Sequence, residues 1–218
     1  MTEIRNLSEP VEFRAEDGKL VAHGYAAKFR TLSQNLGGFV ETIAPGTFAK
    51  TIQEADVRAL FNHDPNLLLG RNRAGTLRLE EDDTGLRYEV DLPDTSVGRD
   101  VAKLLERGDI SGSSFGFRTI EDDWGETDSG FPLRTLKQVA LRDVSPVTYP
   151  AYVDTDSALR SLAEVRGVEL DAVRKAASDN NLAHFVHMVG GAESEEEGRD
   201  DDDRAQPIVV RRQFLHLL

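Results

Sequence analysis

A serine between small residues, Ser114, is the first side chain in this sequence that could do chemistry. It lies in the segment Gly112–Phe117, where glycines would let the backbone approach a substrate closely. Phe115 and Phe117 would alternate onto one face of a strand and anchor it. A serine held rigidly in this way suits nucleophilic attack. The alternative is an ordinary serine that caps, turns or faces water, as most serines in such segments do.

A serine nucleophile needs a base within hydrogen-bond reach, and His63 is the best candidate for that base. It follows the apolar run Val57–Asn62 and precedes Asp64-Pro65, so it is expected where a strand stops and a loop begins. A neutral imidazole can take the serine proton near physiological pH. The alternative is a capping or partly buried histidine without a catalytic role.

Asp143 is the candidate that would orient the base. It stands just beyond the apolar segment Val139–Leu141. Its carboxylate could accept the second imidazole N–H, fix the tautomer and stabilise the imidazolium. The composition of the segment leaves open a surface aspartate that pairs with Arg142.

Three further serines lie close enough in the sequence to be mistaken for the nucleophile: Ser111, Ser113 and Ser145. Alternation along a strand would place Ser113 on the face opposite to Ser114. We therefore expect the serine at position 114, and not its neighbour, to meet the base.

The sequence predicts no metal site and no cofactor. His184 and His187 stand at i, i+3, but no third ligand stands at a supporting spacing. Cysteine is absent, which excludes disulfides, thiolate catalysis and zinc–thiolate sites.

The charge balance disfavours nucleic acid and membranes as partners. A formal charge of −13 and a pI near 4.8 are unlike proteins that neutralise phosphates with lysine and arginine. No stretch approaches the ~18 apolar residues of a membrane span, and the first residues lack the pattern of a secretory signal. Eight acidic residues fall between Glu193 and Asp203, a block that cannot collapse into a core.

Short strands separated by turns predict an α+β fold with a mainly antiparallel sheet or barrel. The expected strands are Val11–Arg14, Lys19–Phe29, Phe39–Ile43, Val57–Asn62, Thr76–Glu80, Leu86–Leu92, Gly112–Ile120 and Leu133–Val144.

Three helices are expected among these strands and after them. One should begin near Pro45-Gly46-Thr47, with Thr47 as its cap. A second should run from Ser96 to Arg107 and end at Gly108, where a left-handed residue is favoured. A third helical pattern covers Val168–Ala177. Residues 1–160 are thus predicted to form one domain, 161–190 a helical extension, and 191–218 an acidic, disordered tail.

Several segments in their order along the chain resemble the prohead protease family of tailed bacteriophages, which is related to the herpesvirus assemblin proteases. The resemblance covers about Val11 to Ala158. The matching segments are Gly24–Phe29, Glu41–Phe48, Leu60–Asp64 with Leu69–Arg71, Ile110–Phe117 and Asp143–Ala151.

The resemblance implies an assemblin-like barrel with surrounding helices and a serine endopeptidase with a Ser/His/acid triad. His63 matches the family's base and Ser114 its nucleophile, while Asp143 stands where assemblins use a second histidine. The region from Tyr149 to Ser157 holds no arginine of the kind that assemblins use for the oxyanion, so no oxyanion donor is assigned.

The resemblance also implies a place and partners for the protein. It would act inside the assembling procapsid in the host cytoplasm, cleave propeptides of the major capsid protein and the scaffold, and cleave itself. Assemblin-type relatives associate as dimers, which makes a homodimer an expectation.

Two other kinds of protein stay open from the residues alone. One is a noncatalytic capsid-assembly scaffold module with a protease-like fold, which would use the acidic tail to bind capsid subunits. The other is a small β-rich ligand-binding domain, in which His63 and Ser114 would lie far apart.

Overall fold

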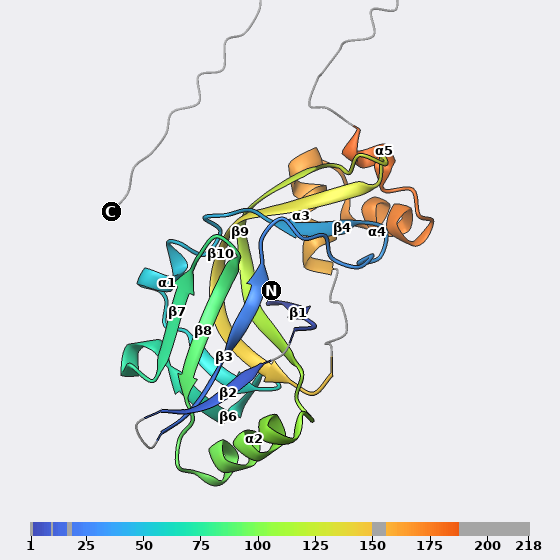
Figure 1. The fold of residues 1–218 in the computed structure, drawn as a ribbon. Coiled ribbons are helices and arrows are strands. Elements are labelled where there is room, and N and C mark those ends of the chain that lie inside the picture. Colours follow the sequence, from blue (N-terminus) through green and yellow to red (C-terminus); the bar gives the residue numbers. More distant parts are fainter. Residues whose placement is uncertain (1, 10, 17–18, 150–155, 188–218) are drawn as a thin grey trace, which may run out of the picture.

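The computed structural model describes residues 2–9, 11–16, 19–149 and 156–187, which form a mixed α+β fold of two sheets and short helices (Figure 1). The predicted acidic tail, residues 191–218, lies outside the described residues. No helix among the described residues is long and apolar enough to cross a membrane.

The larger sheet has six strands and carries all three candidate catalytic residues. Its order is β1-β9-β10-β5-β6, and β4 also pairs with β10. The bounds are β1 (Glu3–Leu7), β4 (Val40–Ile43), β5 (Arg58–Phe61), β6 (Asp64–Arg71), β9 (Gly112–Glu126) and β10 (Pro132–Val147). Strands β4 and β5 run parallel to β10, and the other pairs are antiparallel.

The second sheet has four antiparallel strands in the order β2-β3-β8-β7. Their bounds are β2 (Glu12–Glu16), β3 (Lys19–Lys28), β7 (Leu77–Glu81) and β8 (Gly85–Asp91). The main hydrophobic core joins the two sheets, because Tyr88 and Val90 from β8 and Phe115 and Phe117 from β9 belong to one buried cluster.

The described residues form no closed barrel, because their strands pair as two separate sheets, so the predicted assemblin-like barrel is not confirmed. Alternation of apolar and polar residues identifies a strand and its buried face. It does not say which strands bond to each other, and closure depends on those long-range pairs.

The helix α2 (Ser96–Arg107) has the predicted bounds. The Thr95 side chain accepts a hydrogen bond from the Gly98 N–H at its start, and Gly108, with φ of 78°, ends it. The predicted first helix begins later, as α1 (Thr51–Glu54). Thr47 does not cap it, because its hydroxyl donates to the carbonyls of Ala44 and Leu136.

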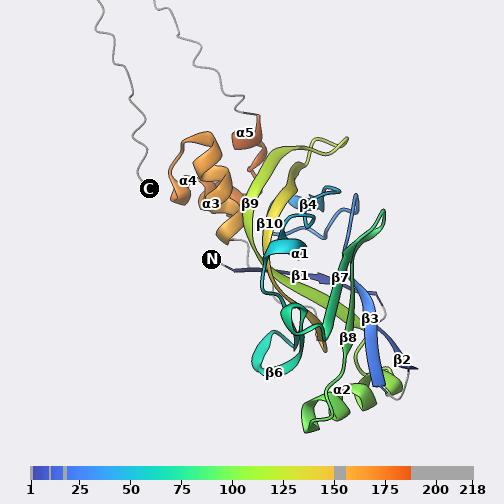
Figure 2. The same cartoon turned by 90° about the vertical axis from the view of Figure 1, so that its left-hand side faces the viewer.

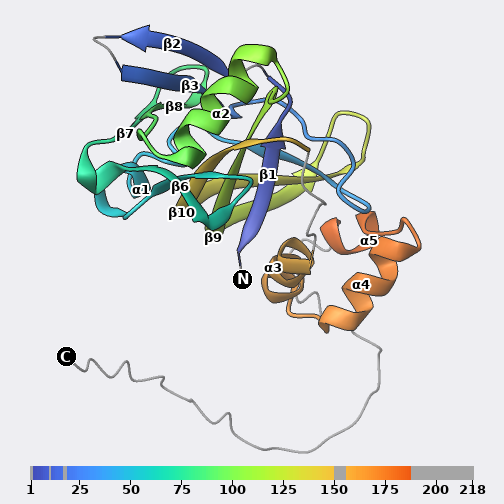
Figure 3. The same ribbon diagram turned by 90° about the horizontal axis from the view of Figure 1, so that it is seen from below.

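Three further helices lie at the end of the molecule opposite to α2, as Figures 1 and 2 both show. They are α3 (Asp156–Arg166), α4 (Leu170–Ser178) and α5 (Ala183–Val186), and a single turn, η1 (Asn72–Ala74), follows β6. In Figure 3 they form a group beside the sheets, and they share a second core with Phe39 and Trp124. Residue 160, the predicted domain boundary, falls inside α3.

Candidate active site

Three side chains far apart in the sequence are joined by two successive hydrogen bonds. The Ser114 Oγ lies 2.6 Å from the His63 Nε2, and the His63 Nδ1 lies 2.5 Å from the Asp143 Oδ2. The structure thus brings together all three residues that the sequence singled out as nucleophile, base and orienting acid.

The pairing of β9 with β10 sets the nucleophile and the acid on one face. Ser114 stands opposite Ser145, and Asp143 stands opposite Gly116, two residues along β9. Since residues i and i+2 of a strand share a face, Ser114 and the Asp143–Gly116 pair point to the same side. Both strands are long, 15 and 16 residues, so two rigid elements hold these side chains.

A two-residue turn delivers His63 to this face. Asn62 and His63 join β5 to β6 and have φ of 53° and 59°, as in the hairpin turn that has positive φ at both central residues. Asparagine is common at the first of these positions and glycine at the second. A histidine at the second position is therefore strained, and such strain tends to be retained where a side chain is needed.

Asn62 ties that turn to the end of β10. Its N–H donates to the Pro146 carbonyl at 3.1 Å, and its Oδ1 accepts from the Thr148 N–H at 2.9 Å. This role of Asn62 was not predicted from the sequence. An asparagine directly before the histidine, between two apolar runs, was the available signal for a tight turn.

Two neighbours of Asp143 were also missed. The Ser145 hydroxyl donates to the Asp143 Oδ2 at 2.9 Å, so this oxygen accepts from both Ser145 and His63. A Cβ on Gly116 would come within 2.4 Å of the Asp143 Oδ1, so glycine leaves the carboxylate in its present position and any other residue would displace it. The spacing of Ser145 from Asp143, i and i+2 on a strand, could have predicted the first contact.

The Ser114 hydroxyl has one proton and two neighbouring acceptor positions. In one arrangement it donates to the Arg5 carbonyl at 2.9 Å, and its oxygen accepts from the His63 Nε2–H. In the other arrangement Ser114 donates to a neutral His63 and the Arg5 carbonyl loses that bond. Only the second arrangement is ready for transfer of the serine proton to the base.

Of the competing serines, Ser145 lies in the site beside Asp143, whereas Ser113 lies elsewhere, as does His23. The Ser113 hydroxyl bonds to the buried Tyr88 hydroxyl at 2.9 Å, on the core side of β9, as alternation predicts. Burial raises the pKa of Tyr88, and the bond from Ser113 only partly offsets it. His23 stands beside Glu12 at the β2–β3 pair, where burial and the charge of Arg14 lower its pKa.

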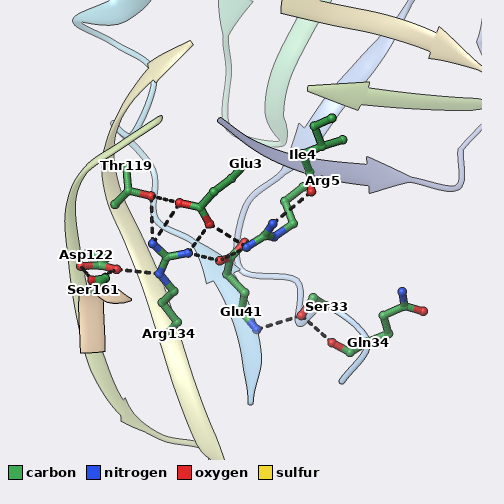
Figure 4. Close-up of polar contacts among 10 residues, drawn as sticks. All are labelled: Glu3, Ile4, Arg5, Ser33, Gln34, Glu41, Thr119, Asp122, Arg134 and Ser161. Atoms are coloured by element: carbon green, nitrogen blue, oxygen red, sulfur yellow. Dashed lines mark hydrogen bonds and ion pairs between the residues drawn. The ribbon is translucent and has the colours of Figure 1, made fainter. Parts of the chain in front are cut away.

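Strand β1 covers Ser114 and is held by a buried ion network (Figure 4). Arg134 contacts Glu3 at 2.6 Å, Glu41 at 2.9 Å and Asp122 at 2.6 Å, and Arg5 bonds to Glu3 and Glu41. Burial acts to raise the pKa of Glu3, but the hydrogen bonds and charges of Arg134 and Arg5 hold it below its ordinary value. The same contacts raise the pKa of Arg134 against the effect of burial. The network thus fixes the strand whose carbonyl touches the nucleophile.

A hydroxyl, an imidazole and a carboxylate in hydrogen-bonded sequence are the groups with which serine hydrolases perform acyl transfer. The chain belongs to the caudovirus prohead serine protease family, whose model matches residues 9–167. It is therefore a serine peptidase of phage capsid maturation.

The prohead protease of Enterobacteria phage HK97 is 27% identical over 163 residues, which cover 73% of this chain and 67% of that protein. The structure is also similar to that of the bacteriophage T4 capsid assembly protease. The TM-score is 0.47 at 13% identity, covering 69% of this chain and 98% of the T4 chain.

Proposed function

We propose that Ser114, His63 and Asp143 are the catalytic triad of this peptidase, and that it cleaves propeptides of the major capsid protein and the scaffold. The observation that carries the proposal is the pair of contacts of His63, 2.6 Å to the Ser114 Oγ and 2.5 Å to the Asp143 Oδ2. Both lie within the reach that proton transfer requires.

In the proposed mechanism the Ser114 Oγ attacks the carbonyl carbon of the scissile bond while the His63 Nε2 takes the hydroxyl proton. His63 then gives that proton to the leaving amine, and the acyl group stays on Ser114. Water, activated by the same nitrogen, hydrolyses the ester and restores the serine. Asp143 holds the Nδ1 proton throughout and stabilises the imidazolium.

The substrate has to displace a neighbour of Ser114 on binding, because Ser114 has no exposed surface and the His63 side chain is only 13% exposed. The Arg5 carbonyl is one group that gives up a contact in the reactive arrangement. A substrate that excludes water also strengthens the interactions inside the site.

The test uses the full chain and a capsid protein that carries its propeptide. Ser114→Ala should abolish cleavage, whereas Ser113→Ala, on the core side of β9, should leave substantial activity. The reverse pattern would overturn the assignment of the nucleophile. A serine-directed phosphonate should label wild type and not Ser114→Ala.

The full burial of Ser114 favours a second candidate function, a noncatalytic capsid-assembly module. This candidate predicts no labelling by the phosphonate and unchanged capsid assembly after His63→Ala. If the triad is catalytic, the phosphonate labels the wild-type protein, and assembly of the His63→Ala variant stops before maturation.

The remaining expectations are part of the same proposal. The enzyme acts inside the procapsid in the host cytoplasm, associates as a homodimer, and cleaves itself. As a relative of the assemblins it would use Asp143 in place of their second histidine. Mass spectrometry of the mature chain tests the self-cleavage, and light scattering tests the dimer.

A further inference from the structure

A pocket of about 260 Å³ continues the face that carries Ser114. Asn6 and Leu7 from β1 line one side, Gly112 lies at the start of β9, and Val147 and Thr148 line the other side at the end of β10. Its eight lining residues come from the three chain segments that meet beside the nucleophile.

The strand register makes this pocket the direct neighbour of the catalytic residues. Val147 pairs with Gly112, and Ser145 pairs with Ser114. The pocket therefore begins two residues from the nucleophile along β9, on the same face of the sheet. Two residues of extended strand cover about 7 Å, roughly the advance of two residues of an extended substrate. Thr148 also bonds to Asn62, the residue before the catalytic base.

Gly112 leaves the pocket open between the two walls. A Cβ there would lie 3.3 Å from the Leu7 carbonyl oxygen and 3.7 Å from the Val147 Cγ2. Any larger side chain at this position would therefore occupy space that now belongs to the pocket. Ser111 and Gly112 thus line a depression in the sheet face near the nucleophile.

The chemistry of the walls selects what can enter. None of the eight lining residues carries a charge, while Val147 and Tyr149 offer apolar side chains. Tyr149 is 82% exposed at the rim, and aromatic side chains in such positions supply contact area for a partner. A charged side chain would lose hydration here without a counter-charge, which is costly.

We propose that this pocket is the specificity subsite of the peptidase, and that it takes an uncharged, apolar side chain of the substrate within two residues of the scissile bond. The inference rests on the proposed function, since the pocket is a subsite only if Ser114 is the nucleophile. It assigns specificity to Val147 and Tyr149, residues that take no part in proton transfer.

The experiment measures kcat/KM of the full chain on peptides built from a cleaved capsid-protein site, with one position at a time changed to Leu, Lys or Glu. Wild type should favour Leu over both charged residues at one position within two residues of the scissile bond. Ser111→Asp adds a negative charge to the exposed lining and should shift the preference at that position toward Lys by about tenfold or more. Tyr149→Ala should lower kcat/KM for the Leu peptide and leave the Lys peptide nearly unchanged.

The matched control is Ser129→Asp. It makes the same change of charge in the turn between β9 and β10, at the opposite end of β9 from Gly112, and should shift no preference. If Ser111→Asp shifts no position, or wild type favours a charged residue at every position, the subsite assignment is overturned while cleavage by Ser114 stands. If wild type cleaves neither peptide nor capsid protein, the proposed function itself has failed.

Discussion

Replacing Gly116 by alanine should lower the catalytic rate, because the added Cβ would clash with the Asp143 carboxylate. The added Cβ would lie 2.4 Å from the Asp143 Oδ1, and ordinary van der Waals contact begins at 3.4 Å, so this oxygen has to retreat by about 1 Å. The backbone at Gly116 does not have a positive φ, so alanine itself is compatible with the strand. The perturbation therefore acts on the carboxylate and not on the chain.

The retreat of one oxygen rotates the other, Oδ2, away from the His63 Nδ1, which it now meets at 2.5 Å. A misplacement of about 1 Å in a catalytic constellation can cost roughly 10²-fold in rate. We therefore expect Gly116→Ala to lower kcat by about 10²-fold on a capsid-protein propeptide, with KM changed little, because in the proposed mechanism Asp143 acts on the substrate only through His63.

Gly125→Ala is the matched control, since a Cβ on that glycine of the same strand meets nothing within 4 Å. It should keep wild-type kcat, and both variants should unfold cooperatively in a thermal scan. In an Asp143→Ala background, Gly116→Ala should have little further effect, because the group it displaces is gone. A folded Gly116→Ala enzyme with wild-type kcat would refute the role assigned to Asp143.

Substitutions at three other positions test the site and its surroundings. His63→Gly and His63→Ala should both be inactive, but the glycine variant should be the more stable by about 1 kcal/mol in urea unfolding, since residue 63 has a φ of 59°; equal stabilities would argue against strain. Ser145→Ala removes one donor to the Asp143 carboxylate and should lower kcat by roughly tenfold without changing KM, because bonds to charged groups contribute about 1.5–3 kcal/mol; an unchanged kcat would contradict the contact's role. Glu3→Gln should cost about 3 kcal/mol at pH 7, because it leaves buried Arg134 partly uncompensated. The pKa of Glu3 is held below 4.5, so this stabilisation is present above pH 4.5 and is lost as the pH falls through the folded value; a loss that does not shrink at low pH would contradict it.

Strands with apolar residues on alternate positions were predictable from the sequence, and β3, β8, β9 and β10 all have predicted counterparts. Strand β1 was missed because its inward positions are charged. Glu3 is 1% exposed and Arg5 is 7% exposed, which is the inverse of the usual pattern. Glu3 and Arg5 contact each other, but the further partners that compensate them, Glu41 and Arg134, lie 36 and 131 residues away, so no local pattern could reveal that these charges are buried.

The residues of the candidate site also fall into those that were predictable from the sequence and those that were not. Ser114, His63 and Asp143 were predictable, because their chemistry and the family resemblance identify them one by one. Gly116 and Ser145 act through Asp143, and their contacts depend on the register between β9 and β10. That register contains a shift between Leu141 and Asp143, which no turn or spacing in the sequence indicates.

The supports of the candidate triad differ in rigidity. Ser114 and Asp143 lie on the longest antiparallel pair, with bonded neighbours on both sides, so they cannot move independently of the sheet. His63 lies on a two-residue turn that is strained and is held at its tip by the contacts of Asn62 with β10. Ser114 has no exposed surface, so a substrate must move something to reach it. The turn is the shorter of these two supports, and Thr148, which anchors it, also lines the proposed subsite. Filling the subsite and aligning the base would then be one event, which would couple recognition of the propeptide to activation of the serine.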